Sequence, residues 1–226
     1  PRDTFEVNVM GTVNLMTAIQ RSANLGSVVN VTTDKVYKNF ELDRAYREED
    51  QLGGVDPYSC SKSCSELTTY SFSRSFQKGY KIATARAGNV IGGGDFAENR
   101  ILPDCIKAAE AGEETIIRNP KAVRPWQHVL EPLHGYLLLA KALYKNETTE
   151  SAFNFGPEQE DCIEVEQLVQ LFCNLWGNDA SWKCEEYLHE GNKESGISLA
   201  TLKESVLLTI DSSKARKILK WNNHWN

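Results

Sequence analysis

Apolar residues recur at helical spacing in several stretches of the chain, and short β-branched runs stand between these stretches. Residues 28–31 are such a run, and it is typical of a strand buried in a parallel sheet. A first helix is predicted over 4–23 from one apolar stripe, made by Phe5, Val9, Val13, Met16 and Ile19. The same patterns predict helices over 56–77, 101–111, 128–145, 164–176 and 212–219, and extended segments over 81–86, 115–118 and 152–155.

Punctuating residues set the expected ends of these elements. Asp56 is predicted to cap the second helix, with Pro57 in its first turn and Gly79 at its end. Gly26 is predicted to stop the first helix, because glycine is common just past a helix C-terminus. Asp211 is predicted to cap the last helix.

Helices and strands alternate up to about residue 98, which predicts an α/β fold with parallel strands. The polar segment 38–55 and the glycine-rich segment 89–94 are expected to be loops. After residue 100 the alternation loosens, and the C-terminal half is expected to form a smaller lobe at the edge of the sheet.

Composition and charge narrow the functional classes. The 226 residues are 41% hydrophobic and 25% charged, as in a folded globular protein. The net charge of −6 repels polyanions, so we expect no nucleic-acid partner. The most apolar stretch, 136–144, is short and contains Lys141, so we expect no membrane partner. Six scattered cysteines without a C-x-x-C pair predict no metal site and fit a reducing cytoplasm.

Two polar clusters carry candidate chemistry. Tyr58 and Lys62 are four residues apart on one helix face, where an ammonium would favour the phenolate form of the tyrosine. Thr33, Asp34 and Lys35 follow directly after a strand, where α/β sheets bind ligands. Plainer interpretations stay open: a tyrosine–lysine pair on a solvated helix, Asp34 capping a backbone amide, and a solvated Lys35.

The order of several motifs resembles the extended short-chain dehydrogenase/reductase family. They are Asn8-Val-Met-Gly-Thr12, Val29-Asn-Val-Thr-Thr-Asp-Lys35, Tyr58-Ser-Cys-Ser-Lys62 and Ala85-Arg-Ala-Gly-Asn89. Within the family, the stretches 32–37, 85–95 and 117–129 are similar to the dehydratases that act on CDP-glucose. The resemblance covers nearly the whole chain. It implies a Rossmann-like, doubly wound parallel sheet with a smaller C-terminal substrate-binding lobe.

The resemblance implies NAD as cofactor, a CDP-sugar as substrate and a role for each catalytic residue. Tyr58 would take the C4 hydroxyl proton while hydride leaves C4 for NAD, Lys62 would hold the nicotinamide ribose, and Thr33 would bind the C4 oxygen. Lys35 would then remove the C5 proton and Asp34 would protonate the departing C6 hydroxyl. The remaining implied contacts are Asn8 and Thr32 to the cofactor, and Asn89, Arg100, Asn119 and Arg124 to the substrate.

Lys35 stands where related dehydratases usually carry glutamate, and a lysine base must be neutral, so we expect burial or Lys62 to depress its pKa. The family's glycine fingerprint for the dinucleotide is absent, which predicts that the first strands of the sheet, about a hundred residues, precede Pro1. We therefore expect residues 1–98 to belong to the NAD-binding and catalytic domain and 99–226 mainly to the nucleotide-sugar lobe.

The resemblance further implies a homodimer through a helical bundle that includes the Tyr58 helix. Two alternatives stay open at the level of function. In the first alternative, the chain is part of a 4-epimerase or of a dehydratase for another nucleotide sugar. In the second, it binds nucleotide sugars without catalysis. His128, at the start of a predicted helix, is expected to be structural.

Overall fold

A three-stranded parallel sheet stands at the centre of the computed structural model, which describes residues 1–22, 24–76, 81–184 and 207–225. Its strands are β1 (Ser27–Val31), β2 (Lys81–Ala87) and β7 (Ala152–Phe155), in the order β1-β2-β7. Ser27 pairs with Lys81 and Thr84 with Ala152, so all three strands run in the same direction. Their carboxyl ends therefore meet at one edge, which is where such sheets bind ligands.

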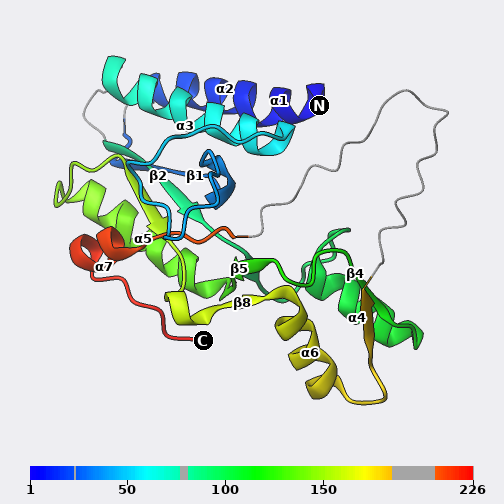
Figure 1. Cartoon of the computed structure of the whole chain (residues 1–226). Coiled ribbons are helices and arrows are strands. Elements are labelled where there is room, and N and C mark those ends of the chain that lie inside the picture. Colours follow the sequence, from blue (N-terminus) through cyan, green and yellow to red (C-terminus); the bar gives the residue numbers. More distant parts are fainter. Residues whose placement is uncertain (23, 77–80, 185–206, 226) are drawn as a thin grey trace.

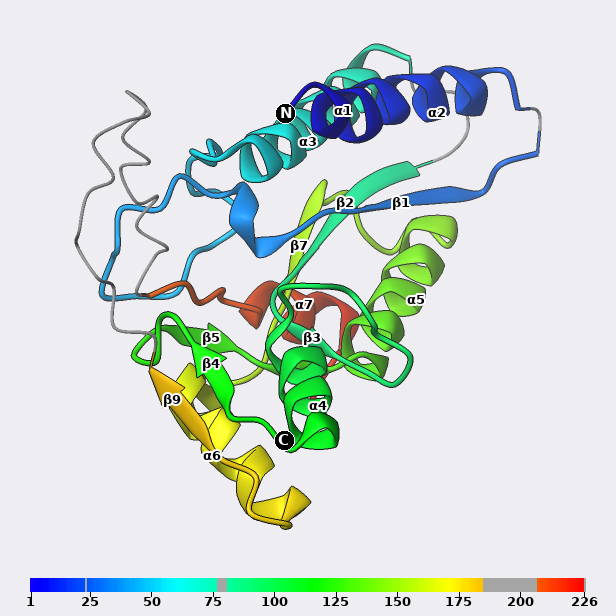
Figure 2. The ribbon, with the colours of Figure 1, turned by 90° about the vertical axis from the view of Figure 1, so that its right-hand side faces the viewer.

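One face of the sheet is covered by two long helical segments (Figures 1 and 2). The first comprises α1 (Arg2–Phe5), a π-helical stretch η1 (Glu6–Met10) and α2 (Gly11–Gln20), and the second is α3 (Pro57–Ser75). Part of their contact is polar: the Asn8 amide donates to the Ser61 hydroxyl at 2.9 Å, and the Thr12 and Ser65 hydroxyls lie 2.8 Å apart. Small hydroxyl side chains let the helices approach closely while keeping every buried hydroxyl bonded.

The opposite face carries the main apolar core. Helices α5 (Leu130–Tyr144) and α7 (Ser213–Leu219) lie against it (Figure 2). Alternation along β2 points its alanines toward α5 and its larger residues Ile82, Thr84 and Arg86 toward α3. The core on the α5 side comprises the alanines Ala83, Ala85 and Ala87 with Leu139, Ala142, Leu143, Phe153, Phe155, Ala215, Leu219 and Trp221.

A second cluster of elements has its own small core. Helices α4 (Ile101–Ala111) and α6 (Val165–Trp176) pack beside the parallel pair β4 (Thr115–Ile117) and β9 (Trp182–Cys184). Cys105, Ile117, Val169 and Cys173 are buried there. Two short strand pairs lie in the segments between this cluster and the sheet. Strand β3 (Val90–Ile91) pairs with β6 (Gln127–His128). Strand β5 (Val123–Pro125) pairs with β8 (Cys162–Glu164), and the single turn η3 (Gln159–Asp161) directly precedes β8. The division at residues 98 and 99 stays a prediction.

The predicted cap at Asp56 is confirmed, but the N-cap of α7 is Ser212 and not Asp211, and one predicted stop is wrong. The Asp56 carboxylate accepts from the Ser59 amide at 3.0 Å, and that of Asp211 accepts from the Ser213 amide at 2.8 Å. Helix α2 ends at Gln20, so Gly26 does not cap it. A Cβ at Gly26 would lie 2.3 Å from the Tyr144 ring, so close packing explains this glycine. The predicted stop at Gly79 lies outside the described residues.

Gly135 gives a test of the main core. A Cβ there would lie 2.4 Å from Cδ1 of Phe155, whose ring is fully buried. We expect Gly135→Ala to lower the free energy of unfolding by about 1–3 kcal/mol, because the core has no room for the methyl group. Gly11→Ala, also within a helix, meets nothing closer than 4.0 Å and should raise stability by about 0.5–1 kcal/mol. Urea unfolding of both variants measures the difference, and equal effects would contradict this packing.

Candidate active site

The first turn of α3 meets the turn that follows β1. This turn is η2 (Asp34–Val36), and Thr33 caps it by accepting from the Lys35 amide at 3.4 Å. Thr33 is the N-cap of this turn, and a hydrogen bond from the Lys35 amide also acts on the pKa of Asp34. Burial raises the pKa of Tyr58, while a hydrogen bond with Thr33 opposes that rise. The Tyr58 side chain is still 43% exposed, so a ligand has access to its hydroxyl.

The same threonine contacts the neighbouring carboxylate. The Thr33 hydroxyl donates to Oδ1 of Asp34 at 3.0 Å, and Asp34 is only 2% exposed. Burial raises the pKa of Asp34, although the Thr33 hydrogen bond and the charges of Lys35 and Arg124 act against the rise. Within the described residues, Oδ2 of Asp34 has no hydrogen-bond partner. Asp34 is thus biased toward its protonated form, as suits a group that delivers a proton.

Three residues that sequence reasoning missed lie around Asp34. A Cβ at Gly88 would lie 3.2 Å from Oδ2 of Asp34 and 2.4 Å from the Pro125 ring, so only glycine fits between them. Burial raises the pKa of Tyr136, and the charge of Asp34 raises it further. The hint in the sequence was a tyrosine inside the most apolar predicted helix, and for Gly88 a glycine directly after a strand.

The two predicted catalytic lysines differ in their surroundings. Lys62 is half-buried one turn after Tyr58, and burial lowers its pKa. Within the described residues no carboxylate forms a salt bridge with Lys62. Lys35 is exposed, so the burial expected of this lysine is not found. Its exposure is also what a solvated loop lysine would have, and its charge acts on both Asp34 and Asp56.

The predicted cofactor contacts are engaged within the protein. The Asn8 amide donates to Ser61, as described above, and the Thr32 hydroxyl donates to Oε1 of Glu66 on α3. Both residues therefore help to join helix and strand. Their part in holding a cofactor stays a prediction.

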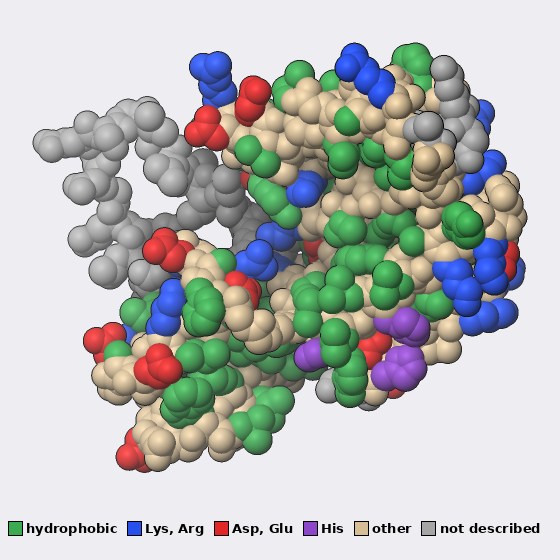
Figure 3. Space-filling view, turned by 180° about the vertical axis from the view of Figure 1, so that it is seen from behind, with side chains coloured by type: hydrophobic (Ala, Val, Ile, Leu, Met, Phe, Trp, Pro, Cys, Tyr) green, Lys and Arg blue, Asp and Glu red, His purple; other side chains and the backbone are tan. Residues whose placement is uncertain are grey.

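The four predicted substrate contacts have different surroundings, and the two arginines act on Asp34 or Tyr58. Arg124 on β5 is buried and acts on Asp34, and the charge of Arg100, at the start of α4, opposes the rise in the pKa of Tyr58. Asn89 follows β2, and its backbone oxygen accepts from the Gln127 amide at 3.0 Å. Asn119 lies in the turn before β5, where its backbone oxygen accepts from the Ala122 amide at 3.2 Å. Figure 3 shows Lys and Arg side chains at the hollow between the helices α1–α3, at the top of the view, and the cluster of α4, α6, β4 and β9 below them.

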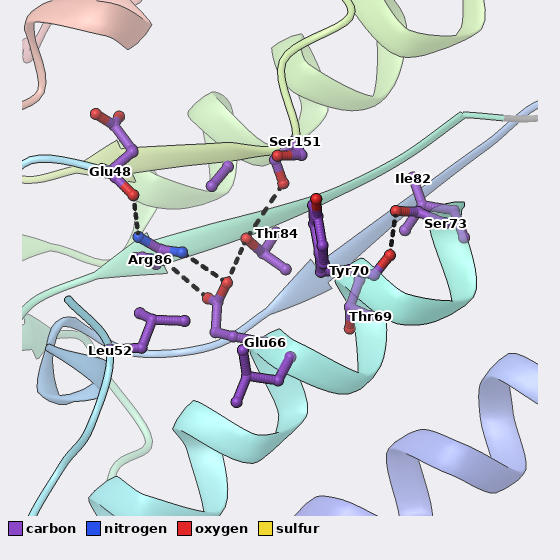
Figure 4. Close-up of a pocket in the computed structure, with 12 residues that line it drawn as sticks. Glu48, Leu52, Glu66, Thr69, Tyr70, Ser73, Ile82, Thr84, Arg86 and Ser151 are labelled. Carbon is purple, nitrogen blue, oxygen red and sulfur yellow. Dashed lines mark hydrogen bonds and ion pairs between the residues drawn. The ribbon is translucent and has the colours of Figure 1, made fainter. Parts of the chain in front are cut away.

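A pocket lies apart from these residues. It has a cavity volume of about 180 Å³ between α3 and β2, and Glu66, Thr84 and Arg86 are among its lining residues (Figure 4). None of Thr33, Asp34 and Tyr58 lines it. Among the residues that the structure describes, no three His, Cys, Asp or Glu side chains gather as a metal ion requires. No helix in that part of the chain is long and apolar enough to cross a bilayer.

Asp34 gives a stability prediction with a definite sign. Because burial raises its pKa above 3.8, the stability that its proton contributes is present below that value and is lost as the pH rises through the folded-state pKa. We expect Asp34→Asn to be more stable than the wild type at neutral pH, and the gain to vanish near pH 4.

Asp50→Asn is the matched control with the opposite sign. Hydrogen bonds from Arg44 lower the pKa of Asp50 to about 2, so its charged form stabilises the fold at neutral pH and that contribution is lost as pH falls. Urea unfolding at neutral pH and near pH 4 measures both variants. A wild type as stable as Asp34→Asn at both values would contradict the assigned burial effect.

The chain matches a known protein family over its whole length. The family model described as GDP-mannose 4,6 dehydratase matches residues 1–226, the whole chain. The chain belongs to this family. The chain is 43% identical, over 235 aligned positions and its whole length, to a CDP-glucose 4,6-dehydratase of Salmonella typhimurium. It is 27% identical over 76% of its length to a CDP-paratose 2-epimerase of Salmonella typhi.

Solved structures support the predicted fold class of this family member. A dTDP-glucose 4,6-dehydratase from Bacillus anthracis in complex with NAD has a TM-score of 0.77 at 20% identity, covering 98% of this chain and 64% of that one. A UDP-glucuronic acid 4-epimerase from Bacillus cereus also has a TM-score of 0.77, at 16% identity, covering 97% and 63%. The chain spans 62% of the length of the Salmonella dehydratase and 57% of the Salmonella epimerase.

Proposed function

We propose that the protein to which this chain belongs dehydrates CDP-glucose to CDP-4-keto-6-deoxyglucose with NAD as cofactor. The observation that carries the proposal is that Thr33 donates to the buried Asp34 at 3.0 Å and also acts on the pKa of Tyr58 from the neighbouring helix. A phenol, a hydroxyl and a buried carboxyl are thus linked at the carboxyl edge of a parallel sheet. The 43% identity to the Salmonella CDP-glucose 4,6-dehydratase supports this substrate over other nucleotide sugars.

The cofactor proposal rests on the state of Lys62. A half-buried ammonium without a carboxylate partner among the described residues suits the hydroxyls of a ribose, and Tyr58 lies one turn away. Lys62 and Tyr58 would hold NAD, together with Asn8 and Thr32. When bound, NAD supplies the acceptor for hydride from C4 and later the donor of hydride to C6.

Each proton transfer of the proposed reaction is assigned to one side chain of the site. Tyr58 takes the proton of the C4 hydroxyl, and Thr33 hydrogen-bonds the C4 oxygen as it becomes a ketone. The ketone acidifies the C5 proton, which Lys35 removes. Asp34, whose pKa burial raises, gives its proton to the departing C6 hydroxyl, so water leaves from C5 and C6. As hydride returns to C6, Lys35 returns its proton to C5, which gives a 4-keto-6-deoxy sugar. The net reaction is a loss of water without net oxidation.

A substrate panel tests this function. The full-length protein is incubated with NAD and CDP-, dTDP-, GDP- or UDP-glucose, and the keto sugar is detected by its absorbance in alkali. We expect product from CDP-glucose at the highest kcat/KM. Product from another sugar alone would reassign the substrate, and interconversion of glucose and galactose derivatives would indicate a 4-epimerase. Binding of CDP without turnover of any sugar would leave only a nucleotide-sugar-binding protein.

We further propose a homodimer formed through the helical layer, in a reducing cytoplasm. Large apolar side chains are exposed there, including Val7 at 71%, Leu67 at 57% and Tyr70 at 57%. Apolar side chains reach the surface over this layer at the top of Figure 3. All six cysteines are free thiols, as fits a reducing compartment. Light scattering should give a dimer mass that Leu67→Arg reduces to a monomer, and a monomeric wild type would refute the interface.

A further inference from the structure

Glu66 is buried on α3 with both of its oxygens fully engaged. The Arg86 guanidinium donates to Oε1 from Nε at 2.9 Å and to Oε2 from Nη2 at 2.8 Å, which is a two-point ion pair. Thr32 donates to Oε1, and Thr84 donates to Oε2 at 2.7 Å. Figure 4 shows Glu66 reaching from the helix toward Thr84 and Arg86 on β2. One carboxylate therefore joins α3 to the ends of both β1 and β2.

The ion pair also reaches the far end of the η2 turn. Arg86 donates from Nη1 to the Tyr37 hydroxyl at 2.9 Å, and that hydroxyl donates to Asn154 on β7 at 2.7 Å. Thr32 directly precedes residues 33–36, and Tyr37 directly follows them. The Glu66–Arg86 pair thus fixes the turn that carries Thr33 and Asp34 on both sides.

Apolar packing alone does not fix the position of the turn 33–36 relative to α3. The pair lines the cavity of about 180 Å³ between α3 and β2, so apolar contacts do not fill the space beside it. Buried ion pairs are weak sources of stability, because desolvation offsets much of their attraction, and apolar replacements of similar volume are often neutral. Stability is therefore an insufficient reason for three side chains to converge on Glu66.

We propose that Glu66 and Arg86 are positioning residues for the proposed reaction: they clamp the turn 33–36 to α3 so that Thr33 stays within hydrogen-bond reach of Tyr58. Glu66 lies two turns after Tyr58 on the same helix stripe, so a helix held at Glu66 is also held in register at Tyr58. The inference rests on the proposed function for its kinetic consequence and on this geometry for its structural one.

The double variant Glu66→Leu/Arg86→Met separates positioning from stability. It removes both charges together, so no unpaired charge stays buried and the melting temperature should stay near that of the wild type. We expect kcat of the full-length protein for CDP-glucose to fall about 100-fold with KM nearly unchanged, because small misplacements of reacting groups cost about that much. Tyr37→Phe removes one arm of the clamp and should lower kcat by less.

Asp50→Asn is the matched control, because it breaks an exposed arginine–carboxylate pair, Arg44–Asp50. It should leave kcat unchanged. A readout without substrate separates this inference from the proposed function: the pKa of Tyr58, followed by NMR and assigned with Tyr58→Phe. Loss of the Thr33 hydrogen bond should raise that pKa in the double variant.

A stable double variant with wild-type kcat and an unchanged Tyr58 pKa would overturn the proposal. So would unfolding of both the double variant and Tyr37→Phe, because the network would then serve stability alone. If the wild type turns over no sugar, the proposed function fails, and the Tyr58 pKa decides the positioning role.

Discussion

Replacing Tyr58 with phenylalanine is expected to lower kcat of the full-length protein about 10³-fold, within the range found when a general base is removed. The phenol is the group placed to take the C4 proton, and Thr33 is its hydrogen-bond partner. At 43% exposure the side chain contributes little packing that the phenyl ring would not keep. Binding of CDP-glucose, measured by calorimetry, should change little, because the substitution affects proton transfer and not the nucleotide.

Tyr70→Phe is the matched control for that loss. Tyr70 lies on the same helix and is 57% exposed, and it lines the pocket beside Glu66 instead of contacting Thr33. Its removal should leave kcat within about twofold of the wild type, as for a surface hydroxyl. On mixing with substrate, Tyr58→Phe should also show no NADH absorbance. Rapid appearance of NADH in that variant would show that another group accepts the proton.

The strong periodic patterns in the sequence predicted the central elements well. Helix α4 and strand β7 have the bounds expected from their patterns, because each is a compact run with clear flanks. Strands β3 and β6 escaped prediction, since two-residue strands arise only from a pairing between distant segments. The segment 38–55 is largely loop as predicted, yet it buries Tyr46, which stacks on Tyr37 at 5.3 Å. Polar surroundings concealed that single core residue.

Local motifs indicated which residues form the candidate site, but they did not indicate how buried each of these residues is. The motif spacing pointed to Tyr58 and Thr33, and the fold brings them together at the edge of the sheet. It could not tell that Asp34 is buried and Lys35 exposed, because adjacent residues in a tight turn point in different directions. Arg86 did leave a signal: a charge in the middle of a buried strand requires a buried partner, and Glu66 is that partner.

Lys35→Ala is expected to separate the two halves of the proposed reaction. Oxidation at C4 depends on Tyr58 and Thr33, so NADH should still form and hydride exchange at C4 should persist. Elimination needs a base for the C5 proton, so formation of the 4-keto-6-deoxy sugar should fall by about 10²–10⁴-fold. Deuterium loss from C4 and the keto-sugar absorbance measure the two halves separately. Lys38→Ala, three residues along the chain, removes a lysine that lies over the Phe40 ring and should leave both rates unchanged.

The exposure of Lys35 makes this variant decisive. The Lys35 side chain is open to solvent, so the proposed role requires the bound sugar nucleotide to cover it. Full turnover in Lys35→Ala would leave Asp34 as the acid without a lysine base, and the C5 proton would then have to be taken by a different group of the site.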